Sequence, residues 1–141
     1  MSENNSTLNV TSTPTGYIMS HIGLGSCVYT SFSSPRILTL TDLPVDCNII
    51  IDFIHIVLVK ASGTCSTQDG NALRLYRISD NHLIYENSNA DGTSLPPPLI
   101  INTTSADNIR IEFEILGRIG TNGFLLKHYS KNNFEILELL R

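Results

Sequence analysis

Hydrophobic and polar residues alternate strictly in one segment of the chain. Between Ile109 and Ile115 each apolar residue is followed by a charged one, in the order IRIEFEI. Successive side chains of a β-strand point to opposite faces, so this pattern predicts a strand with one buried and one solvated face. A second segment, Cys47–Val59, is nearly all apolar and rich in Ile and Val. This predicts a long or bent central strand that is buried on both faces.

Shorter segments of the same kind recur along the chain at intervals of about 8–12 residues. They are bounded by turn residues such as Asp42-Leu43-Pro44 and Asn122-Gly123, and no amphipathic helix lies between them. A parallel α/β sheet would need helical crossovers. The sequence therefore predicts an all-β fold, either a sandwich or a barrel. The further expected strands are Arg36–Thr41, Leu73–Ile78, His82–Glu86, Leu99–Asn102 and Phe124–Tyr129.

The two ends of the chain differ from its centre. Residues 1–16 show almost no hydrophobic periodicity and contain Pro14 and Gly16, so we expect a disordered arm or linker there. The folded domain is expected to span residues 17–131. In the C-terminal extension, residues 132–141, apolar residues recur at every third position, which is typical of a short helix. The triplet Phe134-Glu135-Ile136 is equally typical of an edge strand.

Composition and charge narrow the classes of function. Of the 141 residues, 41% are hydrophobic and only 16% are charged, against a usual charged share of about 25%. The net charge is −4, and the nine basic residues are scattered, whereas binding nucleic acid requires clustered Lys and Arg. No apolar run reaches the length of about 18 residues that a membrane-spanning helix needs. We therefore expect no nucleic-acid partner and no membrane insertion.

Residue types that carry catalysis are present, but not in a productive pattern. The four histidines have no metal-binding spacing. Neither Cys27 nor Cys65 precedes a helix whose N-terminus would favour a thiolate. Glu112 and Glu114 lie two residues apart on a strand, where carboxylates project side by side into solvent. We therefore expect no enzyme activity, no metal and no cofactor.

The three cysteines, at positions 27, 47 and 65, leave two interpretations open. In a secreted protein they indicate one disulfide and one remaining thiol, and in the cytosol they indicate three thiols. Sequons for N-glycosylation begin at Asn4, Asn5, Asn9 and Asn102, and these are candidate glycosylation sites if the chain is secreted.

A longer pattern runs from Cys27 to Tyr129. Cys27 is followed by Ser34-Pro35, and Cys47 opens the strand "CNIIIDF". The segment "IHIVLVKASGTC" then ends at Cys65 and is followed by "DGNALRLYRI". The pattern closes with "NIRIEFEILGRIGTNGFLLKHY", which contains Gly-Phe and the final Tyr. In this order the features resemble the CUB domain, an extracellular jelly-roll sandwich.

The resemblance implies a two-sheet antiparallel jelly-roll fold with a Cys27–Cys47 disulfide. The family's fourth cysteine is absent, so Cys65 is expected to remain a free thiol. Many CUB domains bind calcium through a Glu and two Asp residues, of which only Asp69 has a counterpart here, while the preceding loop offers Lys60 instead of an acid. Calcium prefers six to eight oxygen ligands, so the resemblance carries over no metal site.

The resemblance also implies a function. The chain is expected to be a non-catalytic recognition module, glycosylated, belonging to a larger secreted or cell-surface protein, and present here without a signal peptide. It would bind a protein ligand or neighbouring domains through loops at one end of the sandwich, at 60–71, 87–98 and 117–123. The candidate binding residues are Asp69, Asn71, Asp91, Pro97, Arg118 and Asn122.

Tyr76 and Tyr85 are further candidates for binding if their side chains point outward. The alternative function is a structural jelly-roll subunit of a coat, fibre or trimeric assembly. In that case the low charge and the long apolar strand would reflect a buried interface between subunits.

Overall fold

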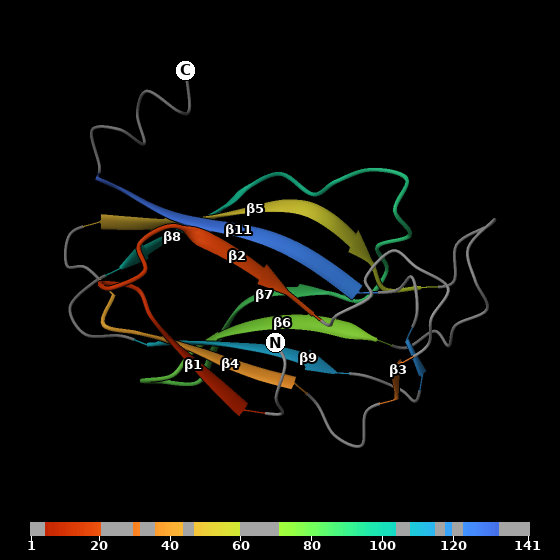
Figure 1. Cartoon of the computed structure of the whole chain (residues 1–141), viewed down its shortest axis with the longest axis horizontal. Helices are drawn as coiled ribbons and strands as arrows, with labels where there is room; N and C mark the ends of the chain where they lie inside the picture. The colour runs from red at the N-terminus through yellow and green to blue at the C-terminus, as the bar shows by residue number, and fades with distance from the viewer. Residues whose placement is uncertain are drawn as a thin grey trace.

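The computed structural model of the chain is an all-β arrangement of two facing sheets (Figure 1). It describes residues 5–20, 30–31, 36–43, 47–59, 71–103, 108–114, 118–119 and 123–132. The predicted all-β, two-sheet architecture is confirmed. No helix in these described stretches is long and apolar enough to cross a bilayer.

The first sheet has five strands in the order β1-β4-β9-β6-β7. Its strands are β1 (Asn5–Asn9), β4 (Arg36–Thr41), β9 (Ile109–Glu114), β6 (Ala72–Arg77) and β7 (His82–Asn87). All neighbours run antiparallel except β1 and β4, which are parallel. The expectation of a purely antiparallel sandwich is therefore wrong at this one pairing.

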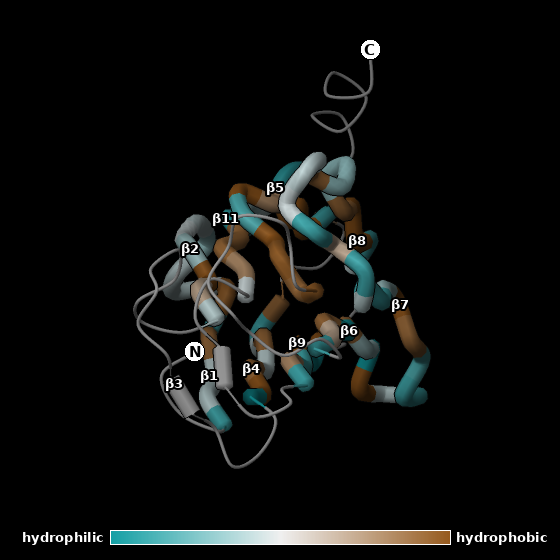
Figure 2. Tube along the Cα trace, turned by 90° about the vertical axis from the view of Figure 1, so that its right-hand side faces the viewer, coloured by the Kyte–Doolittle hydropathy of each residue, from teal (hydrophilic) through white to brown (hydrophobic). Residues whose placement is uncertain are grey.

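The second sheet has four strands in the order β2-β11-β5-β8. Its strands are β2 (Gly16–Met19), β11 (Gly123–Asn132), β5 (Cys47–Val57) and β8 (Leu99–Thr103). A separate antiparallel pair joins β3 (Thr30–Ser31) to β10 (Arg118–Ile119). Figure 2 shows the two main sheets as stacked layers, with β7 and β8 along one open side.

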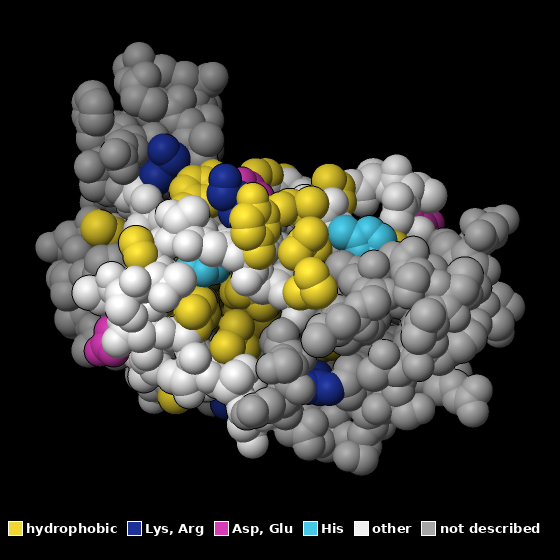
Figure 3. All heavy atoms as spheres, viewed as in Figure 1, with side chains coloured by type: hydrophobic (Ala, Val, Ile, Leu, Met, Phe, Trp, Pro, Cys, Tyr) yellow, Lys and Arg dark blue, Asp and Glu magenta, His cyan; other side chains and the backbone are white. Residues whose placement is uncertain are grey.

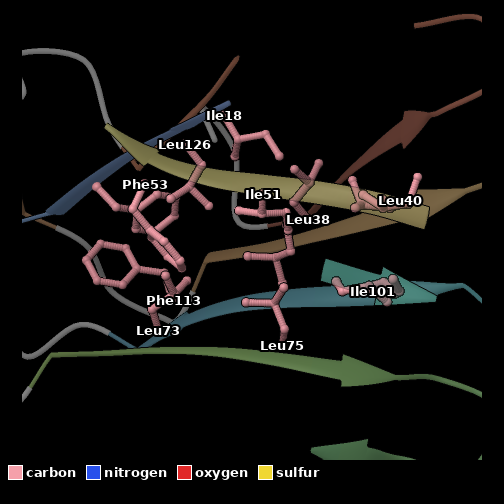
Figure 4. Close-up of a cluster of buried hydrophobic side chains, with 14 of the residues drawn as sticks. Ile18, Leu38, Leu40, Ile51, Phe53, Leu73, Leu75, Ile101, Phe113 and Leu126 are labelled. Atoms are coloured by element: carbon pink, nitrogen blue, oxygen red, sulfur yellow. The ribbon is translucent and has the colours of Figure 1, made fainter. Parts of the chain in front are cut away.

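The hydrophobic core lies between the two sheets. The alternating segment forms β9 as predicted, and its apolar residues Ile109, Ile111 and Phe113 are buried. Phe113 contacts Phe124 of β11 edge to face, with 5.1 Å between the ring centroids. Figure 4 shows side chains from both sheets pointing toward one another in this layer. Each fully buried Leu, Ile or Phe contributes about 1.5–3 kcal/mol to stability.

The central apolar segment forms the long strand β5. Asn48–Ile51, Phe53, Ile56 and Val57 are buried in it. The prediction of a strand covered on both faces therefore holds over Asn48–Ile51, while Ile54 farther along is exposed. The register with β11 shifts between Leu125 and Leu126, where Ile54 is the extra residue of a bulge. A bulge bends a strand and redirects one side chain, and Ile54 is 43% exposed.

The N-terminal segment is not a disordered arm, so that prediction is wrong from Asn5 onward. β1 pairs with β4 along its whole length, and the Val10 amide donates to the Thr41 carbonyl at 2.9 Å. Val10 is only 1% exposed and belongs to the core. The Asn9 side-chain amide also donates to the Asp42 carboxylate at 2.7 Å. Burial against β4 supplies the stability that the local sequence lacks.

The C-terminal extension, expected at residues 132–141, is described only at its first residue. β11 continues to Asn132, which is one residue into the extension expected at 132–141. The question of helix or edge strand falls on residues 133–141, outside the described part of the chain.

We expect Val10→Asp to lower the free energy of unfolding by about 3 kcal/mol or more, because it places an unpaired charge in the core. The matched change Thr7→Asp, at an exposed position of β1 just before Val10, should change it by less than about 0.5 kcal/mol. Urea unfolding of both variants measures the difference. A disordered N-terminal arm would make both substitutions silent.

Candidate functional site

The outer face of the five-stranded sheet is covered by paired charges. Arg74 on β6 forms ion pairs with Glu86 of β7, at 2.6 Å, and with Glu114 of β9. Hydrogen bonding to Glu114 first, and then to Glu86, raises the pKa of Arg74 above its usual value. On the next row, Arg110 pairs with Glu112 at 3.5 Å. Arg74 therefore links three neighbouring strands, whereas Arg110 and Glu112 lie two residues apart on β9.

Arg110 also lies over the ring of Tyr76, 4.5 Å from its centroid. Tyr76 is therefore outward-facing but engaged by its own sheet. Tyr85 instead packs against Phe53 of the opposite sheet, with centroids 5.3 Å apart. It is partly buried against the core, so the outward orientation on which its candidacy as a binding residue depended is not found.

The outer face of the four-stranded sheet is different, and we call it the tyrosine face. It consists of Tyr17, Met19, Asp52, Ile54, Lys127, Tyr129 and Lys131. Three large apolar side chains are exposed on it: Tyr17 at 65%, Met19 at 39% and Ile54 at 43%. The register pairs Tyr17 with Lys127 and Lys127 with Asp52. Figure 3 shows hydrophobic side chains gathered over β2 and β11, with charged groups beside them.

Tyr129 lies at the centre of the tyrosine face. It pairs with Ile50, which is fully buried although it lies outside the core between the sheets. Its phenol also interacts with the carboxylate of Asp52, two residues along β5 from Ile50. We infer that the ring of Tyr129 covers Ile50. Burial first, and then the Asp52 charge, raises the pKa of Tyr129 above its usual value.

The two lysines of the tyrosine face flank Tyr129. Their ammonium nitrogens lie 5.8 Å (Lys127) and 5.9 Å (Lys131) from its ring centroid, within reach of a cation–π interaction. Neither forms a salt bridge within the described part of the chain, whereas Arg74, Arg77 and Arg110 all do. The tyrosine face as defined thus carries two lysines and one acid, Asp52, whose carboxylate interacts with Tyr129, on a protein of net charge −4.

The loop between β7 and β8 encloses a hollow of about 380 Å³, which Asp91 and Pro97 both line. The sequence predicted these two residues as part of one binding loop, and the structure brings them together. Asn87 closes the first turn by accepting from the amides of Asn89 and Ala90, each at 3.1 Å. The loop is thus held in one shape by its own hydrogen bonds.

Two more contacts fasten this loop to β5. The carbonyl of Ala90 accepts from the amide of Leu58 at 2.7 Å. Gly92 has a φ of 85°, and a Cβ there would lie 2.9 Å from Val57, so the close approach requires glycine. Asp91 accepts from the Thr93 amide and hydroxyl, which lowers the pKa of Asp91. The carboxylate of Asp91 thus already accepts two hydrogen bonds from within the loop.

Among the described residues, the structure brings no other predicted site residue into this loop. Asn71 is wrong as a surface binding residue, because it is fully buried beside the start of β6. Arg118 lies in β10, where only the backbone is described. Asp69 and Asn122 lie outside the described residues. Sequence reasoning did not single out the tyrosine face, although Lys127, Tyr129 and Lys131 alternate in a way that places them on one side of a strand.

The predicted cysteine and sequon residues are only partly described. Cys47 is half-buried and is not joined to another cysteine in this structure, while Cys27, its predicted partner, and Cys65 and Asn4 lie outside the described residues. The Cys27–Cys47 disulfide therefore stays a prediction. Asn5 and Asn102 are exposed, in β1 and β8. Asn9 is exposed but bound to Asp42.

Two further features bear on function, namely groups of residues that could hold a metal ion and similarity to known proteins. Within the described ranges, no three His, Cys, Asp or Glu side chains come together as a metal site. The sequence matches no protein-family model, and no curated protein matches it.

His128 is a buried polar residue on the inward side of β11. It is 1% exposed, and among the described residues neither its Nδ1 nor the Oγ of Ser130 has a hydrogen-bond partner. Its Nε2 would lie 3.0 Å from a Cβ at Gly16 of β2, so the imidazole fills the space that a glycine leaves. Burial lowers the pKa of His128 below its ordinary 6.5.

We expect the free energy of unfolding to fall as the pH drops below about 6.5. In that range the unfolded chain binds a proton at His128 that the folded chain resists, so stability rises with pH there. Above that range His128 is neutral in both states and contributes nothing to the slope. Urea unfolding across the range should show a weaker pH dependence for His128→Gln than for wild type. Equal slopes would contradict this assignment.

Proposed function

We propose that this chain is a non-catalytic protein-recognition module that binds its partner on the tyrosine face. One observation carries the proposal, namely the contrast between the two outer faces of the sandwich. On the five-stranded sheet, Arg74 is paired with glutamates of the two neighbouring strands, and Arg110 is paired with Glu112 of its own strand. On the four-stranded sheet, exposed apolar side chains stand beside lysines that have no salt bridge in the described residues.

The chemistry of the tyrosine face supports a particular kind of partner. Tyr and Met are enriched at protein interfaces, and tyrosines often dominate the binding energy. Tyr17 and Met19 supply such groups on an edge strand. Lys127 and Lys131 favour carboxylates opposite them, because complementary charge speeds association and selects the partner. The proposed partner is a protein segment with apolar anchors flanked by acidic residues.

The finer assignment rests on the sequence pattern. We propose a CUB-like jelly-roll module of a secreted or cell-surface protein, with the β7–β8 loop as a second contact region. The support from the fold is coarser, since it consists of two facing β-sheets and a rigid loop at one end. The surface proposed for binding is a sheet face and not only the loops that the resemblance implied.

We expect unbiased peptide-display selection on the wild-type chain to enrich sequences with apolar residues next to Asp or Glu. Their dissociation constants should rise at least about tenfold for Lys127→Gln/Lys131→Gln and for Tyr17→Ser, in line with typical hot-spot losses of about 1.4 kcal/mol or more. Fluorescence anisotropy with the synthetic peptides measures this. Affinity should also fall with added salt.

The matched control is Thr7→Glu/Thr39→Glu on the other sheet, which changes the net charge by the same two units. Thr7 and Thr39 are paired in register on β1 and β4, and their variant should bind within about twofold of wild type. Failure to enrich acidic sequences, or equal loss in both double variants, would overturn the proposal.

Analytical ultracentrifugation separates this function from the alternative of a structural subunit. We expect a monomer at micromolar concentration. A stable oligomer that Met19→Lys or Ile54→Lys dissociates would instead assign the tyrosine face to contacts between copies of the chain, because a buried apolar interface does not tolerate a new charge.

The secreted assignment makes its own prediction. Chain purified from an oxidising compartment should carry one Cys27–Cys47 disulfide, which would stabilise the fold by roughly 3 kcal/mol through loop entropy, and a free Cys65. Intact mass with alkylation, before and after reduction, counts the thiols. Three alkylated cysteines without reduction would remove the extracellular assignment.

A further inference from the structure

A second hollow lies on the open side of the sandwich, at the end away from the β7–β8 loop. Its volume is about 250 Å³, and we call it the open-edge pocket. β7 and β8 are the edge strands of their sheets on this side (Figure 2), so no further strand of the described residues closes the gap between them. The described lining residues are Arg77, His82, Ile84, Ile100, Ile101, Asn102, Thr103 and Ile109.

The floor of the pocket is apolar. Ile84 and Ile109 of the five-stranded sheet and Ile101 of β8 form it. Ile100 alternates to the other side of β8, in register with Ile50. Ile101 and Ile109 belong to the core, and Ile84 packs against it. The pocket is therefore a place where the apolar layer between the sheets opens to solvent, and filling it would remove further apolar surface from water.

The rim of the pocket is polar and basic. The register places Arg77 opposite both His82 and Ile109, so the two basic side chains stand at one mouth of the apolar floor. Arg77 is held in place by Asp80, with contacts of 3.0 and 2.7 Å. The hydrogen bond from Arg77 is the main cause that lowers the pKa of Asp80 to about 2.

The opposite part of the rim comes from β8. Asn102 is exposed there, and its amide can donate a hydrogen bond. β8 is also an edge strand, and an edge strand points part of its backbone N–H groups away from its sheet. None of the described lining residues is acidic. The polar groups around the pocket are thus suited to a ligand head that accepts hydrogen bonds and carries negative charge.

We propose that the open-edge pocket binds a small monocarboxylate with a short apolar chain. The carboxylate lies toward Arg77, His82 and Asn102, and the chain lies on the isoleucine floor. The volume equals that of about eight water molecules at roughly 30 Å³ each, which matches a molecule such as hexanoate. A ligand with so few atoms can gain only a limited binding free energy, so we expect a dissociation constant on the order of 1 mM.

This site is separate from the tyrosine face and does not depend on the proposed protein partner. The test is a titration of the whole chain, labelled with ¹³C at the isoleucine δ1 methyls, with sodium hexanoate followed by NMR. We expect saturable shifts at Ile84, Ile101 and Ile109, and none at Ile54, which is exposed on the tyrosine face. Hexylamine, with the same chain and opposite charge, should bind at least about fivefold more weakly.

Two variants test the rim. Arg77→Gln/His82→Gln should weaken hexanoate at least about fivefold, and Lys127→Gln, which removes one positive charge elsewhere, should not. His82→Gln alone leaves the Arg77–Asp80 pair intact and should weaken hexanoate about twofold or more, which keeps the test valid if the double variant unfolds. Equal binding of hexanol or hexylamine, shifts that do not saturate, or shifts spread over all isoleucines would overturn the proposal.

Discussion

The packing of the two sheets against each other is the interaction on which the rest of the structure depends. Inward side chains of β5 and β11 meet those of β4, β6 and β9, and Phe113 and Phe124 join the layers at an edge-to-face contact. Strand side chains alternate between faces, so burial of one set fixes which residues remain outside. The charged rows, the tyrosine face and the open-edge pocket all follow from which side chains are buried between the two sheets.

The two outer faces acquire opposite properties from their registers. On the five-stranded sheet the strands bring Arg74 within reach of Glu86 on one side and Glu114 on the other, so opposite charges meet and neutralise one another. On the other sheet, Lys131 lies opposite Asn48 and Lys127 lies opposite Asp52. Neither lysine forms a salt bridge within the described residues, and both stand beside Tyr129 on the same strand. The face that keeps its positive charge is also the face with exposed apolar side chains, and that coincidence favours it as the recognition surface.

The edges of the sheets decide where ligands could enter. β7 and β8 follow one another in the chain yet belong to different sheets, so the loop that joins them must cross the open side of the sandwich. The loop lies at one end of this open side, where Ala90 and Gly92 fasten it to β5. At the other end of the open side, where β7 begins and β8 ends, the gap between the sheets remains as the open-edge pocket. A protein partner on the tyrosine face and a small molecule at the edge would therefore occupy separate surfaces.

The sequence by itself determined the strands whose pattern is local. Strict alternation predicted β9, the apolar run predicted β5, and turn residues separated most of the others. It could not predict β1, because Leu8 and Val10 become buried only when β4 lies beside them. Loop composition likewise suggested that Asn71 is exposed, although its neighbours in space bury it. The tyrosine face was decided by tertiary structure alone, since β5 is apolar on both sides and only the position of the opposite sheet determines which side faces solvent.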